Sequence, residues 1–236
     1  MDQRPFFFKR FALFHHRSTM KIGTDAILLG RWVEVSENDE VLDIGTGCGL
    51  LPLMLAQKGI KSADAVEIDR DSFDEAAQNF SNSAWKSRLF AINDDVKHYA
   101  ENCTKKYDLV VSNPPFFFGD NIPEKEKKGL ARHTNTLSYN DLLVAVKKLL
   151  KPEGRFALVL PSRESLTFLK DAENQGFYLE KEMKIVPIEG KEPNRINMQL
   201  VVNKVDMIKS ETFVLRHPDH SFTKEYKEFL KDYYLD

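Results

Sequence analysis

The stretch that decides the fold is Val41-Leu42-Asp43-Ile44, followed by Gly45-Thr46-Gly47-Cys48-Gly49. A short, mostly apolar run of this kind is typical of a buried strand, and residues 50–57 after it have the apolar period of a helix. Glycines at alternate positions let the backbone turn sharply and approach a ligand closely at the start of a helix. The sequence therefore predicts a strand, a tight turn and a helix, with a binding site at the turn.

The spacing of the glycines distinguishes between two classes of ligand. A dinucleotide-binding turn would have its third glycine where this chain has Leu50. Asp43 shortly before the turn would repel a pyrophosphate, but it suits a ligand with an ammonium group and a sulfonium. We therefore predict that S-adenosyl-L-methionine binds at Asp43, Gly45, Gly47 and Gly49. The alternative is a purely structural turn in which Asp43 caps the following helix.

Strand-like and helix-like segments alternate around this turn. The runs that predict buried strands are residues 40–44, 63–68, 89–92, 108–112 and 155–160. Segments of helical period separate them at residues 50–57, 71–80 and 139–150. This alternation predicts an α/β protein with a mostly parallel sheet, right-handed crossovers and helices on both faces.

The pattern changes after Pro161. A helical segment at residues 164–174 is followed by strand-like runs at 177–187 and 196–203, joined by a turn that contains glycine and proline. These runs predict a closing hairpin, so that the sheet has seven strands and an antiparallel edge strand. A last amphipathic stretch, residues 223–234, predicts a terminal helix packed against the sheet.

Composition limits the classes of protein to consider. The 236 residues suffice for one sizeable core, and no repeat or linker divides them, so we expect a single domain over residues 1–236. A net charge of -2 excludes a protein held to nucleic acid by bulk charge. Cys48 and Cys103 cannot form a four-ligand zinc site and suit a reducing compartment, so we expect a cytoplasmic protein without a metal. The apolar start is split by Lys9 and Arg10 and predicts neither a signal peptide nor a membrane span.

Acidic side chains follow the next two predicted strands. Glu67 ends the second strand, where a carboxylate accepts hydrogen bonds from both hydroxyls of a ribose. Asp69 is the rival for this role, but it has the position of an N-cap for the next helix. After the third strand, we expect Asp95 rather than Asp94 to contact the adenine amine, with helix capping as the alternative.

The most informative tetrapeptide is Asn113-Pro114-Pro115-Phe116, directly after the fourth strand. Its prolines fix the backbone, so the segment projects an amide, a carbonyl and a ring from the sheet edge where open α/β proteins bind ligands. The exocyclic amine of a base is a poor nucleophile and needs acceptors for its two hydrogens. We predict that the Asn113 side chain and the Pro114 carbonyl accept them, while Phe116 stacks on the base and Phe117 extends the apolar wall. The alternative is a stiff loop with its phenylalanines in the core.

Together these motifs resemble class I S-adenosylmethionine-dependent methyltransferases over most of residues 39–203. Within that superfamily the chain resembles the bacterial tRNA1(Val) adenine N6-methyltransferases. The closer resemblance is carried by Lys21-Ile22-Gly23-Thr24-Asp25 with Leu28-Leu29-Gly30, by Arg132-His133, and by the ending Leu230-Lys231-Asp232-Tyr233-Tyr234-Leu235. It implies a Rossmann-like fold and N6-methylation of the adenosine at position 37, beside the anticodon.

The resemblance also assigns roles to segments outside the glycine turn. The segment before the first strand, within residues 1–38, would cover the methionine end of the cofactor and give Lys21, Thr24 and Asp25 a binding role. The implied partner is the anticodon stem-loop of a tRNA, bound by a monomeric chain. Asn113 would border both the cofactor and the target base.

A long segment without apolar period lies between the fourth strand and the next helix. We expect residues 116–137 to form a lid loop. Arg132 and His133 at its end would contact RNA, or alternatively carry solvated charge.

Other functions remain open on the motifs alone. The same tetrapeptide occurs in ribosomal RNA guanine N2-methyltransferases and in release-factor glutamine methyltransferases, but both usually carry an extra preceding domain, and only about forty residues precede this glycine turn. DNA adenine methyltransferases need a recognition insert that is not evident in the sequence. A cofactor-binding module without catalysis is a further alternative, and a dehydrogenase is disfavoured by Leu50 and Asp43.

Overall fold

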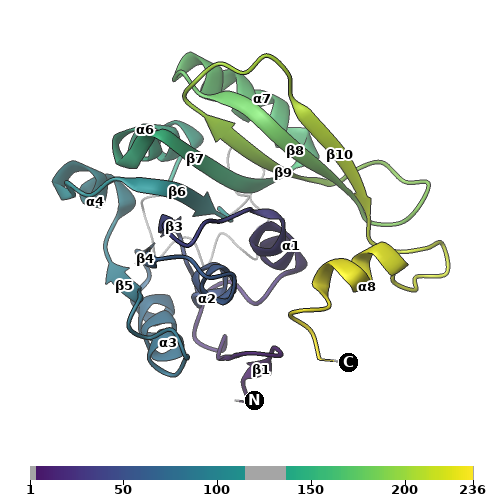
Figure 1. The fold of residues 1–236 in the computed structure, drawn as a ribbon, viewed down its shortest axis with the longest axis horizontal. Coiled ribbons are helices and arrows are strands. Elements are labelled where there is room, and N and C mark those ends of the chain that lie inside the picture. The colour runs from purple at the N-terminus through teal and green to yellow at the C-terminus, as the bar shows by residue number, and fades with distance from the viewer. Residues whose placement is uncertain (1–3, 115–136, 236) are drawn as a thin grey trace, which may run out of the picture.

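The computed structural model describes residues 4–114 and 137–235. A single large sheet forms its centre, with helices on both faces (Figure 1). The strands are β3 (Glu40–Ile44), β4 (Ser62–Glu67), β5 (Leu89–Asn93), β6 (Tyr107–Ser112), β7 (Leu150–Pro161), β8 (Tyr178–Val186), β9 (Arg195–Val201) and β10 (Lys209–Val214). Their order across the sheet is β10-β8-β9-β7-β6-β3-β4-β5, and β9 runs antiparallel to both of its neighbours.

Two apolar layers hold the helices to the sheet. One face is covered by α1 (Thr24–Trp32), α2 (Leu50–Gln57), α3 (Arg70–Ser81) and α8 (Lys224–Leu230), and the other by α4 (Val96–Asn102), α6 (Tyr139–Leu149) and α7 (Ser162–Asn174). Alternate side chains of β6 separate the layers, because successive residues of a strand point to opposite faces. Leu109 and Val111 belong to the first layer and Val110 to the second.

A small hairpin lies outside the sheet and joins the two ends of the chain. It is formed by β1 (Phe6–Phe7) and β2 (Ala12–Leu13). The ring of Phe8 stacks on Phe11 and on Tyr234 near the C-terminus. Aromatic packing therefore anchors the start of the chain close to its end.

The predicted fold class is confirmed, but the sheet differs in two details. It has eight strands instead of seven, and the antiparallel strand β9 lies between β7 and β8 rather than at the edge. Residues 196–200 of β9 are all buried, as expected for a strand with neighbours on both sides and helices on both faces. The edge strand on this side of the sheet is β10, whose residues 209–212 are exposed. An edge strand that buries so little leaves almost no apolar pattern in the sequence.

Strand order brings the predicted ligand-binding segments together. Ile44 at the end of β3 is paired with Val66 of β4 on one side and with Ser112 of β6 on the other. The chain passes from β3 to β4 on one side and later returns to β6 on the other side, so the strand order reverses between β3 and β6. Open α/β sheets bind ligands at such a switch point, beyond the carboxyl ends of the strands. Asp43, Glu67 and Asn113 all lie at this edge.

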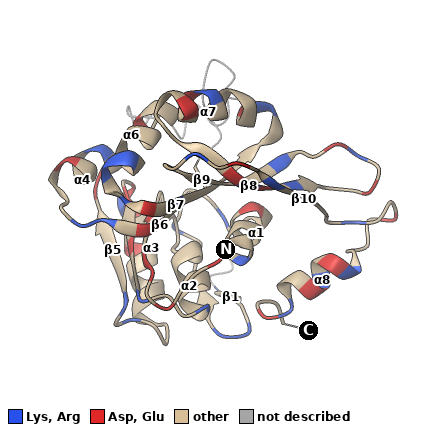
Figure 2. Ribbon diagram, turned by 45° about the horizontal axis from the view of Figure 1, so that its top comes forward, with Lys and Arg blue, Asp and Glu red and all other residues tan. Residues whose placement is uncertain are grey.

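Basic and acidic residues are mixed along the described elements, for example on α7 and α8 (Figure 2). In the described part of the chain, no helix is long and apolar enough to cross a membrane. The same residues hold no group of three or more potential metal ligands.

Candidate functional site

The turn between β3 and α2, which we call the glycine loop (residues 45–49), has the left-handed backbone that its sequence predicts. Gly45, Gly47 and Gly49 have φ angles of 70°, 56° and 85°. A methyl group added at Gly45 or Gly47 would meet no atom of the described residues within 4 Å, whereas one at Gly49 would lie 2.5 Å from the Phe80 ring. The first two glycines therefore face open space, and the third allows α3 to pack against the loop.

Asp43 is buried beneath this loop. Its residue is 1 % exposed, and neither carboxylate oxygen has a hydrogen-bond partner among the described residues. Burial raises the pKa of Asp43 to about 7; the Glu67 carboxylate adds to the rise and the nearby Thr46 hydroxyl opposes it. The capping alternative is wrong, because the N-cap residue of α2 is Gly49 and no side-chain hydrogen bond caps this helix. A buried, unpartnered carboxylate fits a cationic ligand group.

Glu67 closes the loop from the neighbouring strand. Its Oε2 accepts a hydrogen bond from the Gly47 N–H at 2.8 Å, and its Oε1 accepts one from the Asp69 N–H at 2.9 Å. Each oxygen keeps a second acceptor position, so the carboxylate can also receive two hydroxyl groups. Burial raises the pKa of Glu67, while the two backbone donors oppose the rise.

Asp69 caps the next helix, as its position in the sequence predicts. Its carboxylate accepts hydrogen bonds from the Ser72 N–H at 2.8 Å and the Ser72 hydroxyl at 2.7 Å. The carboxylate of Asp69 therefore supports α3, which leaves Glu67 as the candidate for the ribose.

A cavity of about 70 Å³ opens beside Glu67. Its lining residues are Ile44, Gly45, Val66, Glu67, Ile68, Asp94, Asp95, Val96, Lys97 and Leu137. The Asp95 side chain caps α4 through the Lys97 N–H at 2.7 Å, so the capping alternative describes its present contact. Asp94 lies 2.9 Å from Nδ1 of His98 through both carboxylate oxygens. Sequence reasoning missed α4, a helix of seven residues with only two buried ones.

Asn113 follows β6 at the point where that strand passes the glycine loop. The preceding Ser112 donates its hydroxyl to the Ile44 carbonyl at 2.9 Å, which ties the two strand ends together. The Oδ1 atom of Asn113 is buried and has no partner among the described residues, and Pro114 is buried. Phe116, Phe117, Arg132 and His133 lie outside the described residues, as does the expected lid apart from Leu137.

Comparison with known proteins agrees with this geometry. The methyltransferase small domain model matches residues 12–172. A tRNA1(Val) (adenine(37)-N6)-methyltransferase from Trichodesmium erythraeum is 39% identical, covering 100% of this chain and 99% of its own. One of the same name from Parabacteroides distasonis is 38% identical, covering 98% of each chain. The chain belongs to the methyltransferase small domain family, among the tRNA1(Val) (adenine(37)-N6)-methyltransferases.

Solved structures share the fold of this methyltransferase at low sequence identity. A predicted O-methyltransferase from Agrobacterium tumefaciens has a TM-score of 0.67 at 15% identity, covering 89% of this chain and 96% of its own. The glycopeptide N-methyltransferase MtfA, complexed with S-adenosyl-L-methionine, has a TM-score of 0.55 at 13% identity, covering 78% and 100%. Both likenesses concern the fold alone.

The remaining predicted residues of the methyltransferase lie in the segment before α1, here called the strap (residues 14–23), and in the first turn of α1. Lys21 donates its ammonium to the carbonyls of His15 and His16 at 2.9 and 3.0 Å. Thr24 starts α1 and is exposed, and Asp25 pairs with Arg195 at 2.9 Å. The structure therefore connects Asp25 to β9, a contact that no sequence pattern indicates.

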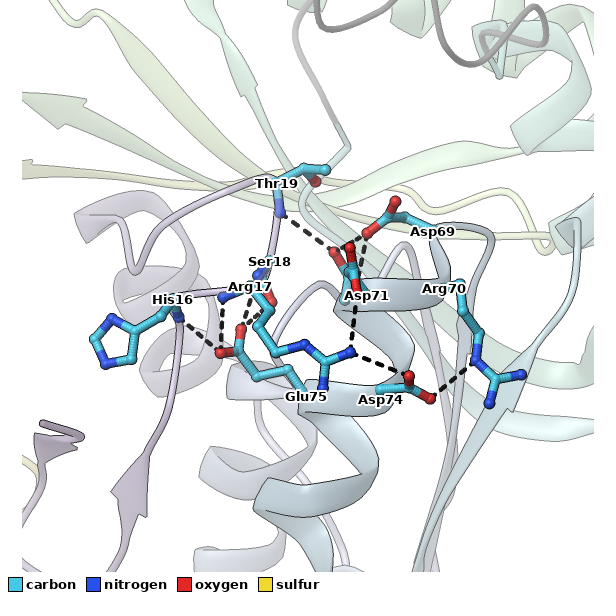
Figure 3. Close-up of polar contacts among 10 residues, drawn as sticks. His16, Arg17, Ser18, Thr19, Asp69, Arg70, Asp71, Asp74 and Glu75 are labelled. Carbon is cyan, nitrogen blue, oxygen red and sulfur yellow. Dashed lines mark hydrogen bonds and ion pairs between the residues drawn. The ribbon is translucent and has the colours of Figure 1, made fainter. Parts of the chain in front are cut away.

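Two residues of α3 that sequence reasoning missed hold the strap. The carboxylate of Glu75 accepts hydrogen bonds from the N–H groups of His16, Arg17 and Ser18 and from the Ser18 hydroxyl (Figure 3). Asn79 accepts from the Phe14 N–H and donates to the Phe14 carbonyl. Both occupy buried positions of a helix, where an acidic or amide residue is unexpected, and this is the one signal in the sequence that could have found them.

Proposed function

We propose that this protein transfers the methyl group of S-adenosyl-L-methionine to N6 of adenosine 37 in tRNA1(Val). The observation that carries the proposal is a pair of buried acceptors at the ends of adjacent strands beside an open glycine loop. The carboxylate oxygens of Asp43 and the Oδ1 atom of Asn113 have no hydrogen-bond partner within the described part of the chain. The names of relatives that align with the whole chain support the choice of substrate. With a tRNA as substrate, we place the protein in the cytoplasm, acting as a monomer.

The described residues fit each part of the cofactor. Asp43 would accept hydrogen bonds from the ammonium group of the cofactor, and Glu67 would accept them from the ribose hydroxyls. Gly45, Gly47 and Gly49 would let the methionine part of the cofactor lie close to the protein backbone. The cavity beyond Glu67 would receive the adenine, with Asp95 and its neighbour Asp94 on its wall. Lys21, Thr24 and Asp25 would border the methionine end. When bound, S-adenosyl-L-methionine supplies a methyl group on a positively charged sulfur.

Asn113 and Pro114 would hold the amine that receives the methyl group. The Asn113 Oδ1 atom and the Pro114 carbonyl would each accept one hydrogen of N6, which keeps the nitrogen oriented as it becomes tetrahedral and gains positive charge. Acceptors fixed in advance stabilise that charge without reorganising. The proton then leaves N6 to solvent, since no ionisable base is needed once the nitrogen is cationic. Phe116 and Phe117 would stack on the flipped base, and Arg132 and His133 would contact the RNA.

The test is methylation of a defined RNA. Purified protein is incubated with methyl-labelled S-adenosyl-L-methionine and unmodified tRNA1(Val), and the nucleosides of the tRNA are then quantified by mass spectrometry. We expect N6-methyladenosine at position 37 and none in a transcript with guanosine at that position. Label in N2-methylguanosine of ribosomal RNA, or in the glutamine of a release factor, with none in tRNA would contradict the proposal.

A further inference from the structure

The strap is attached to α3 by buried contacts to its backbone. Glu75 and Asn79 are each 1 % exposed. Oε1 of Glu75 accepts from the N–H groups of His16 at 2.7 Å and Arg17 at 3.0 Å, and Oε2 accepts from the N–H and the hydroxyl of Ser18 at 2.9 and 2.5 Å. Four donors on one carboxylate fill its acceptor positions, so these contacts specify the path of the strap.

The same helix also holds the glycine loop. The Asn79 amide donates to the Cys48 carbonyl at 2.8 Å and, at the same distance, to the Phe14 carbonyl of the strap. Its Oδ1 accepts from the Phe14 N–H at 2.9 Å. One side chain therefore bridges the strap and the glycine loop.

A second connection runs from the other end of the strap. The Thr19 N–H donates to the Ser72 hydroxyl at 3.3 Å, and that hydroxyl donates to Asp69 (Figure 3). The Asp69 N–H in turn donates to Glu67, which also receives the Gly47 N–H. Strap, α3 and glycine loop are thus joined twice by continuous hydrogen bonds.

We propose that Glu75 and Asn79 are positioning residues for cofactor binding, which make the strap and the glycine loop one unit. The inference rests on the proposed function, because it takes S-adenosyl-L-methionine as the ligand of the glycine loop. A ligand that secures Glu67 and Gly47 secures the strap as well, although Glu75 does not touch it. The strap contains Lys21 and leads directly into Thr24, the first residue of α1.

Exposed contacts to the same strap serve as an internal comparison. The Arg17 side chain pairs with Asp71 and Asp74 at 2.9 and 3.2 Å, but 47% of it and 69% and 31% of its partners are exposed. Exposed ion pairs contribute little to stability. Asp74 lies next to Glu75 in α3, so Asp74→Asn and Glu75→Gln are the same chemical change at an exposed and a buried anchor.

The first experiment uses the native protein and backbone amide hydrogen exchange, with and without saturating S-adenosyl-L-methionine. We expect the cofactor to slow exchange at residues 16–19 as well as in the glycine loop, by about ten-fold or more. Protection of the glycine loop with unchanged exchange in the strap would overturn the inference. If the native protein neither binds the cofactor nor methylates tRNA, the proposed function itself fails, which is a different outcome.

The second experiment measures steady-state methylation by the variants. In Glu75→Gln an NH2 group faces backbone N–H donors, so we expect KM for S-adenosyl-L-methionine to rise about ten-fold or more. The turnover number at saturating cofactor should change less than about three-fold, because Asn113 and Pro114, which would hold the methyl-accepting amine, are unchanged. Asp74→Asn should leave KM within about two-fold of the native value.

A milder variant covers the case in which Glu75→Gln does not fold. Ser18→Ala removes one of the four donors, and we expect it to raise KM for the cofactor about two- to five-fold with native turnover. Native KM in Ser18→Ala together with native KM in a folded Glu75→Gln would overturn the inference. An equal rise of KM for the cofactor in Glu75→Gln and Asp74→Asn would also overturn the inference.

Discussion

Two pairs of polar side chains flank the glycine loop and differ in one respect. Asp43 and Asn113 lie on the sheet, and Glu75 and Asn79 lie on α3; each pair is a carboxylate and an amide. All the acceptor positions of Glu75 and the amide of Asn79 are used within the protein. The oxygens of Asp43 and Oδ1 of Asn113 are buried without partners among the described residues. Native proteins rarely leave such groups unsatisfied, so we propose that the first pair faces a ligand, whereas the second pair joins parts of the protein to one another.

The largest expected effect removes an unpartnered acceptor from the amine site. Asn113→Ala should lower single-turnover methylation of a tRNA anticodon stem-loop by about 10²–10³-fold, because one preorganised polar group is lost. Affinity for the cofactor, measured by calorimetry, should change little. Asn113→Asp retains an oxygen and should keep more activity than Ala. Native turnover in Asn113→Ala would mean that its unpartnered oxygen has no role in the reaction.

The next effect concerns the unpartnered carboxylate. Asp43→Asn should weaken S-adenosyl-L-methionine binding about 10–100-fold, the range expected for a lost charge-assisted hydrogen bond. Thermal unfolding of the ligand-free variant near pH 8 should show a gain of about 1–3 kcal/mol, since ionising a carboxylate whose pKa is raised costs stability. A variant that loses stability while binding the cofactor normally would place Asp43 with the second pair.

Because the pKa of Asp43 is raised, both the stability of the protein and its affinity for the cofactor should depend on pH. In the folded protein its pKa is about 7 against an ordinary 3.8, so its protonated form contributes stability below pH 3.8, and this contribution is lost as pH rises toward 7. A cationic ligand prefers the ionised form, so calorimetric affinity should weaken as pH falls below about 7. Asp43→Asn, which cannot titrate there, should lose that part of the pH dependence.

Glu67 would bind the ligand and also accepts hydrogen bonds from the protein backbone. We expect its substitution to have a smaller effect on cofactor affinity. Glu67→Ala removes both proposed ribose contacts and the acceptor of the Gly47 N–H, so cofactor affinity should fall about ten-fold. Unchanged affinity by calorimetry would rule out Glu67 as the ribose ligand. Asp69→Ala is the control: it removes the α3 cap at a cost of about 1 kcal/mol in stability and should affect affinity less.

The smallest expected difference lies within the glycine loop itself. Both Gly45→Ala and Gly49→Ala would force a left-handed residue, which costs about 1–2 kcal/mol. Only Gly49→Ala also drives a methyl group against Phe80, so its free energy of unfolding should be lower than that of Gly45→Ala by about 1 kcal/mol or more. Gly45→Ala should instead weaken cofactor binding. Equal unfolding free energies by denaturant titration would contradict this division.

Sequence reasoning predicted most of the fold because strands and helices carry their own signals. The bounds of β3 and α2 agree with the predicted ones residue by residue, and the remaining predicted strands and helices all exist, with ends that shift by a few residues. Among the elements that were not predicted, which also include α1, β1 and β2, the elements α4 and β10 bury too few side chains to leave a periodic pattern. The position of β9 inside the sheet is a matter of pairing, which periodicity does not encode.

The sequence by itself determined the local backbone of the glycine loop and of Asn113-Pro114, because the conformational effects of glycine and proline extend over only a few residues. The tertiary structure alone decided which polar groups are satisfied. The partners of Glu75 in the strap lie up to 59 positions away, and Arg195 lies 170 positions from Asp25. Whether a buried carboxylate has partners within the protein depends on such distant hydrogen-bond donors, and no local sequence pattern indicates them.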